Sequence, residues 1–150
     1  MRRAHAEASA LIDAPAAEIY AVLTDYGNAH PHILPKPYFT KLAVEQGGIG
    51  AGTIIRIHML VFGTERIVRQ RVSEPEPGRV LVEQDMDADL ATTFTVIPVA
   101  DGQQAQVTIA TDWATKAGIM GWIEQTLTRR MLQSIYIKEL RQLADYVKRR

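Results

Sequence analysis

The fold is decided by the stretch KAGIMGWIEQTLTRRMLQSIYIKELRQLADYV, residues 116–147. Apolar residues recur along it in steps of three, four and five, the spacing that places them on one face of an amphipathic helix. They are Ile119, Trp122, Ile123, Leu127, Met131, Ile135, Leu140, Leu143 and Val147. The pattern predicts one helix of roughly 30 residues, about 45 Å long. A helix with such a face has to bury it against another layer of structure.

The residues before this helix predict that layer, because they alternate between apolar and polar side chains with the period of a β-strand. A first strand is expected over residues 5–13, and a helix from Asp13-Ala14-Pro15 to about Gly27. Residues 28–37, with three prolines, allow no more than one further helical turn. Six more strands are expected at residues 39–44, 52–62, 64–72, 79–84, 92–99 and 105–113. The turns between them are short, so neighbouring strands should be antiparallel.

Composition narrows the class of protein. The length of 150 residues suits one domain, spanning 1–150. There is no cysteine, which excludes disulfides and thiol chemistry and suits the cytoplasm, where we expect the protein to act. No apolar run is long enough to span a membrane. Lys+Arg and Asp+Glu are 17 each, so the balanced charge does not favour a nucleic-acid partner, although basic residues gather after Arg129. The sequence leaves the oligomeric state open.

Five short motifs, taken in order, resemble the START-like (SRPBCC) superfamily and in particular its polyketide cyclase/dehydrase branch. They are IDAP (12–15), LTDY (23–26), GAGT (50–53), EPEPGR (74–79) and IP (97–98). The resemblance implies an α+β helix-grip fold: a seven-stranded curved antiparallel sheet wrapped around a long C-terminal helix, with two short helices after the first strand. It also implies a cavity between sheet and helix.

The resemblance leaves three functions open. The first is binding or transport of a hydrophobic small molecule such as a lipid, an isoprenoid or an aromatic polyketide-like compound. The second is a cyclase or dehydrase acting on such a molecule, and the third is a ribosome- or RNA-associated interaction protein. No nucleophile–base motif separates the first two, so whether the protein is an enzyme stays open.

Strand alternation predicts which side chains face the cavity. A site for a small molecule is mostly apolar with a few placed polar groups, and Gln70, Gln84 and Thr111 stand among inward apolar neighbours. The predicted ligand-binding residues are Ile57, Met59, Val68, Gln70, Val82, Gln84, Phe94, Val96, Ile109, Thr111, Trp113, Ile119, Trp122, Ile123 and Leu127. Because these side chains are mostly of medium size, we expect a cavity of several hundred Å³.

The densest group of titratable residues follows the first predicted helix. Asp25, Tyr26 and His32 are the candidate proton carriers for a catalytic role, since histidine titrates near neutral pH. Asp25 with His30 and His32 lacks the spacing and the further ligand of a zinc site. We therefore predict no metal site and no cofactor.

Overall fold

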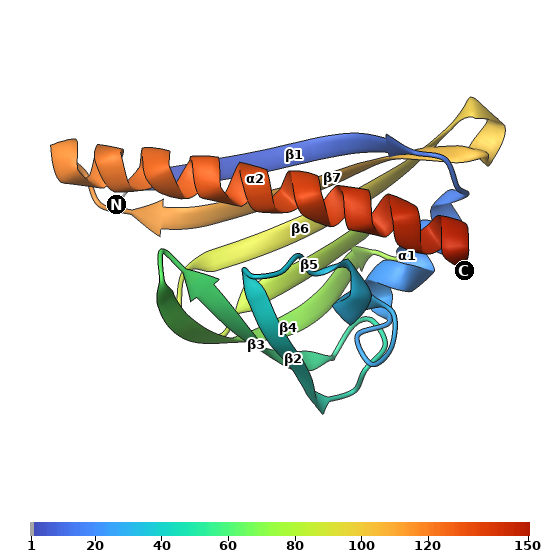
Figure 1. The fold of residues 1–150 in the computed structure, drawn as a ribbon, viewed down its shortest axis with the longest axis horizontal. Helices are drawn as coiled ribbons and strands as arrows, with labels where there is room; N and C mark the ends of the chain where they lie inside the picture. The colour runs from blue at the N-terminus through green and yellow to red at the C-terminus, as the bar shows by residue number, and fades with distance from the viewer. Residues whose placement is uncertain (1) are drawn as a thin grey trace.

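The computed structural model describes residues 2–150. Its main elements are a seven-stranded antiparallel sheet and one long helix (Figure 1). This arrangement confirms the predicted α+β helix-grip fold. The elements, in chain order, are β1 (Arg2–Ile12), α1 (Ala16–Thr24), the 3-10 turn η1 (His30–Ile33), β2 (Phe39–Gln46), β3 (Ile54–Val61), β4 (Thr64–Glu76), β5 (Val80–Asp85), β6 (Leu90–Val99), η2 (Ala100–Gly102), β7 (Gln104–Thr115) and α2 (Ile119–Arg149).

The sheet has the strand order β1-β7-β6-β5-β4-β3-β2, and every neighbouring pair is antiparallel. Consecutive strands from β2 to β7 pair directly, as their short connections require. The β3–β4 hairpin is the tightest: Val61 pairs with Thr64, and Phe62 and Gly63 between them both have positive φ. Two such residues give the backbone twist that matches a two-residue hairpin.

Helix α2 crosses the concave face of the sheet, and β2, β3 and β4 curl away from β1 on the other side of it (Figure 1). Its buried face lies in the C-terminal two thirds of the helix: Leu132, Ile135, Tyr136, Glu139, Leu140, Leu143 and Val147. Helix α1 and η1 pack against the same part of α2, where the figure places them beside its C-terminal end. The core is therefore concentrated at one end of the molecule.

The beginning of α2 differs from the prediction that Ile119, Ile123, Leu127 and Met131 point at the sheet, since of these four only Met131 packs against the core. Ile119 is 76% exposed, Ile123 is 42% exposed and Leu127 is 53% exposed. Trp122, on the same stretch, is 61% exposed. Periodicity identifies the apolar stripe of a helix correctly, but it does not show how far along the helix a partner layer extends.

Strand β5 has the opposite orientation to the predicted one. Leu81 and Glu83 face the concave side and are buried, whereas Val82 is half-buried and Gln84 is exposed. The pairing of β5 with its two neighbours fixes this orientation. Glu83 pairs with Val72 of β4 and with Thr92 of β6, both of which are buried. A shift of one residue reverses every side chain of a strand, and the run Val80-Leu81-Val82 offers no alternation from which to choose.

Of the helices described here, none combines the length with the apolarity needed to cross a bilayer.

Candidate functional site

A cavity of about 110 Å³ lies between the concave face of the sheet and the buried face of α2. Its wall is predominantly apolar, with side chains from β3, β4, β6 and α2 that include Ile57, Val68, Phe94 and Leu132. The volume is smaller than the several hundred Å³ expected, because Tyr136 and Leu132 of the helix project into the space that the strand residues leave. Pockets of this kind, apolar with a few polar groups, are typical of small-molecule sites.

Glu83 brings a carboxyl group to this wall from the middle of β5, where it is almost fully buried. The hydroxyl of Tyr26 donates a hydrogen bond of 2.7 Å to its Oε2 atom. Burial raises the pKa of Glu83 to about 7, and the hydrogen bond from Tyr26 opposes part of that rise. At neutral pH the acid and its conjugate base are therefore both well populated.

His30 lies next to this carboxyl, held by the 3-10 turn η1 that follows α1. Its ring stacks on Tyr26 at 4.5 Å between centroids, and its Nδ1 atom lies 2.7 Å from the carbonyl oxygen of Leu23. Because a carbonyl only accepts, Nδ1 carries the proton, and the neutral ring leaves Nε2 as an acceptor, 3.7 Å from Oε2 of Glu83. Burial lowers the pKa of His30 to about 4, so the ring is uncharged at neutral pH.

Helix α2 contributes Tyr136 and Glu139 to the same cavity, from positions three residues apart on its buried face. The Tyr136 hydroxyl is hydrogen-bonded to that of Thr111, which in turn bonds Thr92 at 2.8 Å. Glu139 is 2% exposed, and no hydrogen bond to its carboxyl forms within residues 2–150. Burial, and then the nearby Glu83, raise the pKa of Glu139 well above its usual range.

Gln70 completes the polar wall from β4, where it is 7% exposed. Its Oε1 atom is buried and, among residues 2–150, has no hydrogen-bond partner. An unsatisfied buried acceptor costs about 1–3 kcal/mol. The cavity therefore contains polar atoms that the chain itself leaves without partners.

Six of the residues predicted to bind a ligand line this cavity. They are Ile57, Met59, Val68, Gln70, Phe94 and Thr111. Three others, Val96, Ile109 and Trp113, face inward but are packed in the core instead of lining the cavity.

The remaining six predicted ligand contacts lie elsewhere. Val82 and Gln84 lie on the outer side of β5, and Gln84 donates hydrogen bonds to the backbone at Asp85 and Leu90. Ile119, Trp122, Ile123 and Leu127 are exposed on the first turns of α2. They do not line the cavity, because the buried face of α2 begins only at about Leu132.

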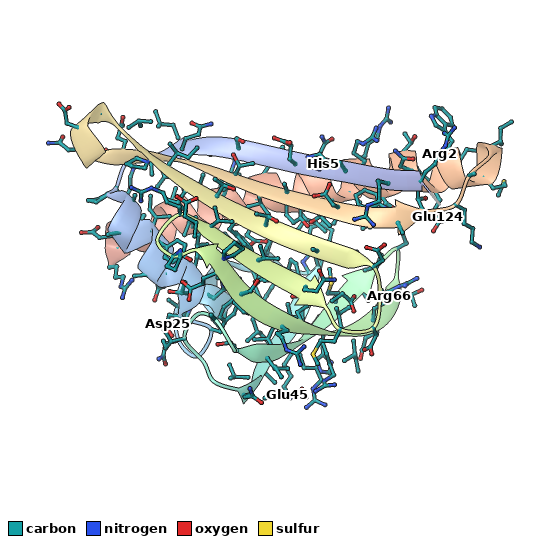
Figure 2. The ribbon with its side chains drawn as sticks, turned by 180° about the vertical axis from the view of Figure 1, so that it is seen from behind. Arg2, His5, Asp25, Glu45, Arg66 and Glu124 are labelled. Atoms are coloured by element: carbon teal, nitrogen blue, oxygen red, sulfur yellow. The ribbon has the colours of Figure 1, made fainter. Side chains whose placement is uncertain are left out.

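The three candidate proton carriers are separated by the fold. Asp25 lies at the periphery of the molecule (Figure 2), where its carboxyl accepts a hydrogen bond from the backbone of Asn28. His32 is exposed and stacks on Tyr146, 5.3 Å between ring centroids. Neither side chain lines the cavity. Tyr26 alone is buried beside the cavity, through its hydrogen bond to Glu83.

Six polar residues of the site were not predicted from the sequence: His30, Glu83, Asp85, Thr92, Tyr136 and Glu139. For Glu139 a signal existed, since it falls on the apolar stripe of the helix between Tyr136 and Leu143. A carboxylate on a buried stripe is uncommon and indicates a special environment. No such signal marks Glu83, because it begins an acidic run, which is typical of a solvent-exposed loop.

Comparison with known proteins supports the same architecture. The family described as polyketide cyclase / dehydrase and lipid transport matches residues 3–148. The solution structure of the KanY protein is 28% identical, with a TM-score of 0.84 over 99% of both chains. The Zhui aromatase/cyclase from Streptomyces sp. R1128 is 18% identical, with a TM-score of 0.74 over 99% of this chain and 96% of that one.

A START superfamily protein from Mycobacterium smegmatis is 14% identical, with a TM-score of 0.73 over 97% of this chain and 98% of that one. At such identities the two latter structures establish the fold alone. No curated protein sequence matches the chain significantly. The family match spans nearly every residue, and the chain belongs to the polyketide cyclase / dehydrase and lipid transport family.

Proposed function

We propose that this protein binds a predominantly apolar small molecule in the cavity between the sheet and α2. The apolar wall gives such a molecule a favourable free energy of transfer from water. The family description, which couples cyclase/dehydrase activity with lipid transport, supports a ligand of this class.

The observation that carries the proposal is the buried Oε1 atom of Gln70, which has no hydrogen-bond partner among residues 2–150. The carboxyl of Glu139, a residue that is 2% exposed, likewise makes no side-chain hydrogen bond within these residues. Both side chains line the cavity. Leaving such groups buried destabilises the fold, whereas a bound molecule with a hydrogen-bonding group would satisfy them.

Titration with 4-phenylbutan-1-ol, followed by two-dimensional amide NMR, tests the proposal. We expect saturable shifts at backbone amides around Gln70, Glu83 and Phe94. Val68→Trp should abolish them by filling the cavity. Ile67→Trp is the matched control, because the neighbouring Ile67 is 56% exposed and does not line the cavity. Shifts that survive Val68→Trp, or shifts confined to the exposed start of α2, would contradict binding in the cavity.

A second candidate function, cyclization or dehydration of the bound molecule, is favoured by Glu83 itself. A carboxyl whose pKa lies at about 7 can both take and give a proton at neutral pH, which is the requirement for general acid–base catalysis. Tyr26 donates to that carboxyl and would hold it in orientation. Glu83→Gln should then abolish turnover of a poly-β-keto substrate while leaving its binding intact. Turnover unchanged by Glu83→Gln would exclude Glu83 as the acid–base group.

We also propose that the protein acts in the cytoplasm, because a chain without cysteine suits a reducing compartment. Cell fractionation with detection by antibody tests this, and recovery in an extracellular fraction would refute it.

A further inference from the structure

The charged side chains that line the cavity are all acidic. Three acidic side chains line it, namely Glu83, Asp85 and Glu139, and no Lys or Arg among residues 2–150 does so. Oδ1 of Asp85 accepts hydrogen bonds from the backbone of Asp87 and Ala88, and Asp85 is only half-buried. Glu83 and Glu139 are the two acidic groups of the wall that are buried.

The wall is also rich in acceptors that lack donors. Oε1 of Gln70 is unsatisfied, Nε2 of His30 carries a lone pair, and Glu139 has no partner within residues 2–150. Tyr26 donates its hydroxyl proton to Glu83, and the hydroxyls of Tyr136, Thr111 and Thr92 are joined in one chain of hydrogen bonds. A ligand that brings hydrogen-bond donors would satisfy the acceptors that remain.

We propose that the ligand is a cationic amphiphile, with an apolar body against the sheet and a primary or secondary ammonium group held by Glu83 and Glu139. The inference rests on the proposed function and specifies its ligand class. An ammonium group has only donors and a positive charge, so it matches both the acceptors and the carboxyls. A metal ion does not fit as well, because within residues 2–150 no three His, Asp or Glu side chains converge as ligands.

Proton balance follows from the surroundings of the two carboxyls. Burial and, for Glu139, the neighbouring Glu83 favour the protonated acids when the cavity holds no cation. The other titratable groups at the cavity are Tyr26, His30, Asp85 and Tyr136, of which none is a cation at neutral pH. When an ammonium group binds, one carboxyl ionises, its proton leaves to solvent, and the pair formed is neutral overall.

The test uses three probes with the same apolar skeleton: 4-phenylbutylamine, 4-phenylbutan-1-ol and 4-phenylbutanoate. Dissociation constants from NMR titration should rank the amine roughly 10-fold or more tighter than the alcohol, since hydrogen bonds to charged groups are the stronger ones. The butanoate should bind weakest, because it would bury a carboxylate beside Glu83 and Glu139 with no positive charge to pair with it. At about pH 6, a pH indicator in weakly buffered solution should report close to one proton released per amine bound, and none for the alcohol.

The double variant Glu83→Gln/Glu139→Gln keeps the shape of the wall and removes its charge. We expect it to bind the amine no better than the alcohol and to release no proton, while its two-dimensional amide NMR spectrum shows that it is folded. Glu124→Gln is the matched control, because Glu124 is exposed on the first turns of α2 (Figure 2).

Three results would overturn the inference. If the alcohol or the butanoate binds as tightly as the amine, the cavity does not select a cation, although binding of an apolar molecule there would stand. If the double variant keeps the preference for the amine, the ammonium group is held elsewhere. If none of the three probes binds, the proposed binding function falls together with the inference.

Discussion

The substitution Glu83→Gln gives the sharpest test of the site, because it changes one buried carboxyl and little else. Glutamine has nearly the same shape, and its side-chain oxygen can still accept the hydrogen bond that Tyr26 donates to Glu83. What the variant lacks is a group that ionises. Any pH-dependent difference in stability between the two proteins therefore reports the environment of this carboxyl.

The sign of that difference follows from the direction of the pKa shift. In the unfolded chain Glu83 loses its proton near its ordinary pKa of 4.5, whereas in the folded protein burial holds the pKa at about 7. Between these values the folded state binds more protons, so the free energy of unfolding of the wild type falls as pH rises. The free energy of unfolding of Glu83→Gln does not fall in this way, because glutamine does not ionise. The stability of the variant relative to the wild type should rise through this window and level off above it.

The size of the effect follows from the shift. Each pKa unit corresponds to about 1.4 kcal/mol, so the window from 4.5 to about 7 gives a relative gain of roughly 3 kcal/mol for Glu83→Gln. His30 acts in the opposite direction on both proteins. Burial lowers its pKa to about 4, so its neutral form destabilises the fold as pH falls below its ordinary value of 6.5. The wild-type curve alone is consequently flattened, and the difference between the two proteins removes the contribution of His30. Because Glu83 also raises the pKa of Glu139, the difference reports Glu83 together with its effect on that neighbour.

Urea unfolding followed by circular dichroism, from about pH 5 to about pH 8, measures both free energies under two-state conditions. Glu124→Gln should differ from the wild type by a constant small amount across the range, because Glu124 is exposed. A difference for Glu83→Gln that stays flat or falls with rising pH would refute the reasoning. It would mean that water reaches the carboxyl of Glu83 and that the cavity is not a low-dielectric site.

Two further outcomes are expected from single substitutions. Leu143→Ala should destabilise the protein by roughly 2–5 kcal/mol, because Leu143 is fully buried under the sheet, whereas Leu127→Ala should stay within about 0.5 kcal/mol. Equal thermal shifts for the two would contradict the placement of α2. Tyr26→Phe removes the hydrogen bond that lowers the pKa of Glu83 and should move that pKa further upward, as carbon-13 NMR of the carboxyl would show. An unchanged titration curve would exclude the contact.

The fold was predictable because its determinants are local and repeated. Alternation in β3, β4, β6 and β7 set the inward faces correctly, and the short turns required antiparallel neighbours. The long amphipathic run at the C-terminus then left one arrangement, a helix across one face of the sheet. Each of these signals involves residues a few positions apart, which a single sequence displays directly.

The site was predictable only in part, because its polar groups depend on pairing between distant segments. Glu83 faces inward since β5 is registered against β4 and β6, and no property of residues 80–84 alone indicates that. The exposure of Trp122 likewise depends on where the sheet ends relative to the helix. His30 and His32 are two residues apart in one loop, yet one is buried and the other exposed. Local pattern cannot distinguish such positions.

The buried carboxyls of Glu83 and Glu139 lower the free energy of unfolding, which indicates that they are retained for function. At neutral pH a protein with Gln at positions 83 and 139 should be more stable than this one, because neither carboxyl gains a cationic partner in the folded chain. Groups that lower stability persist where activity requires them. Glu83 and Glu139 come from different layers, β5 and α2, and meet only at the cavity. Their retention there is explained if a ligand supplies the positive charge that no Lys or Arg of residues 2–150 brings to the cavity.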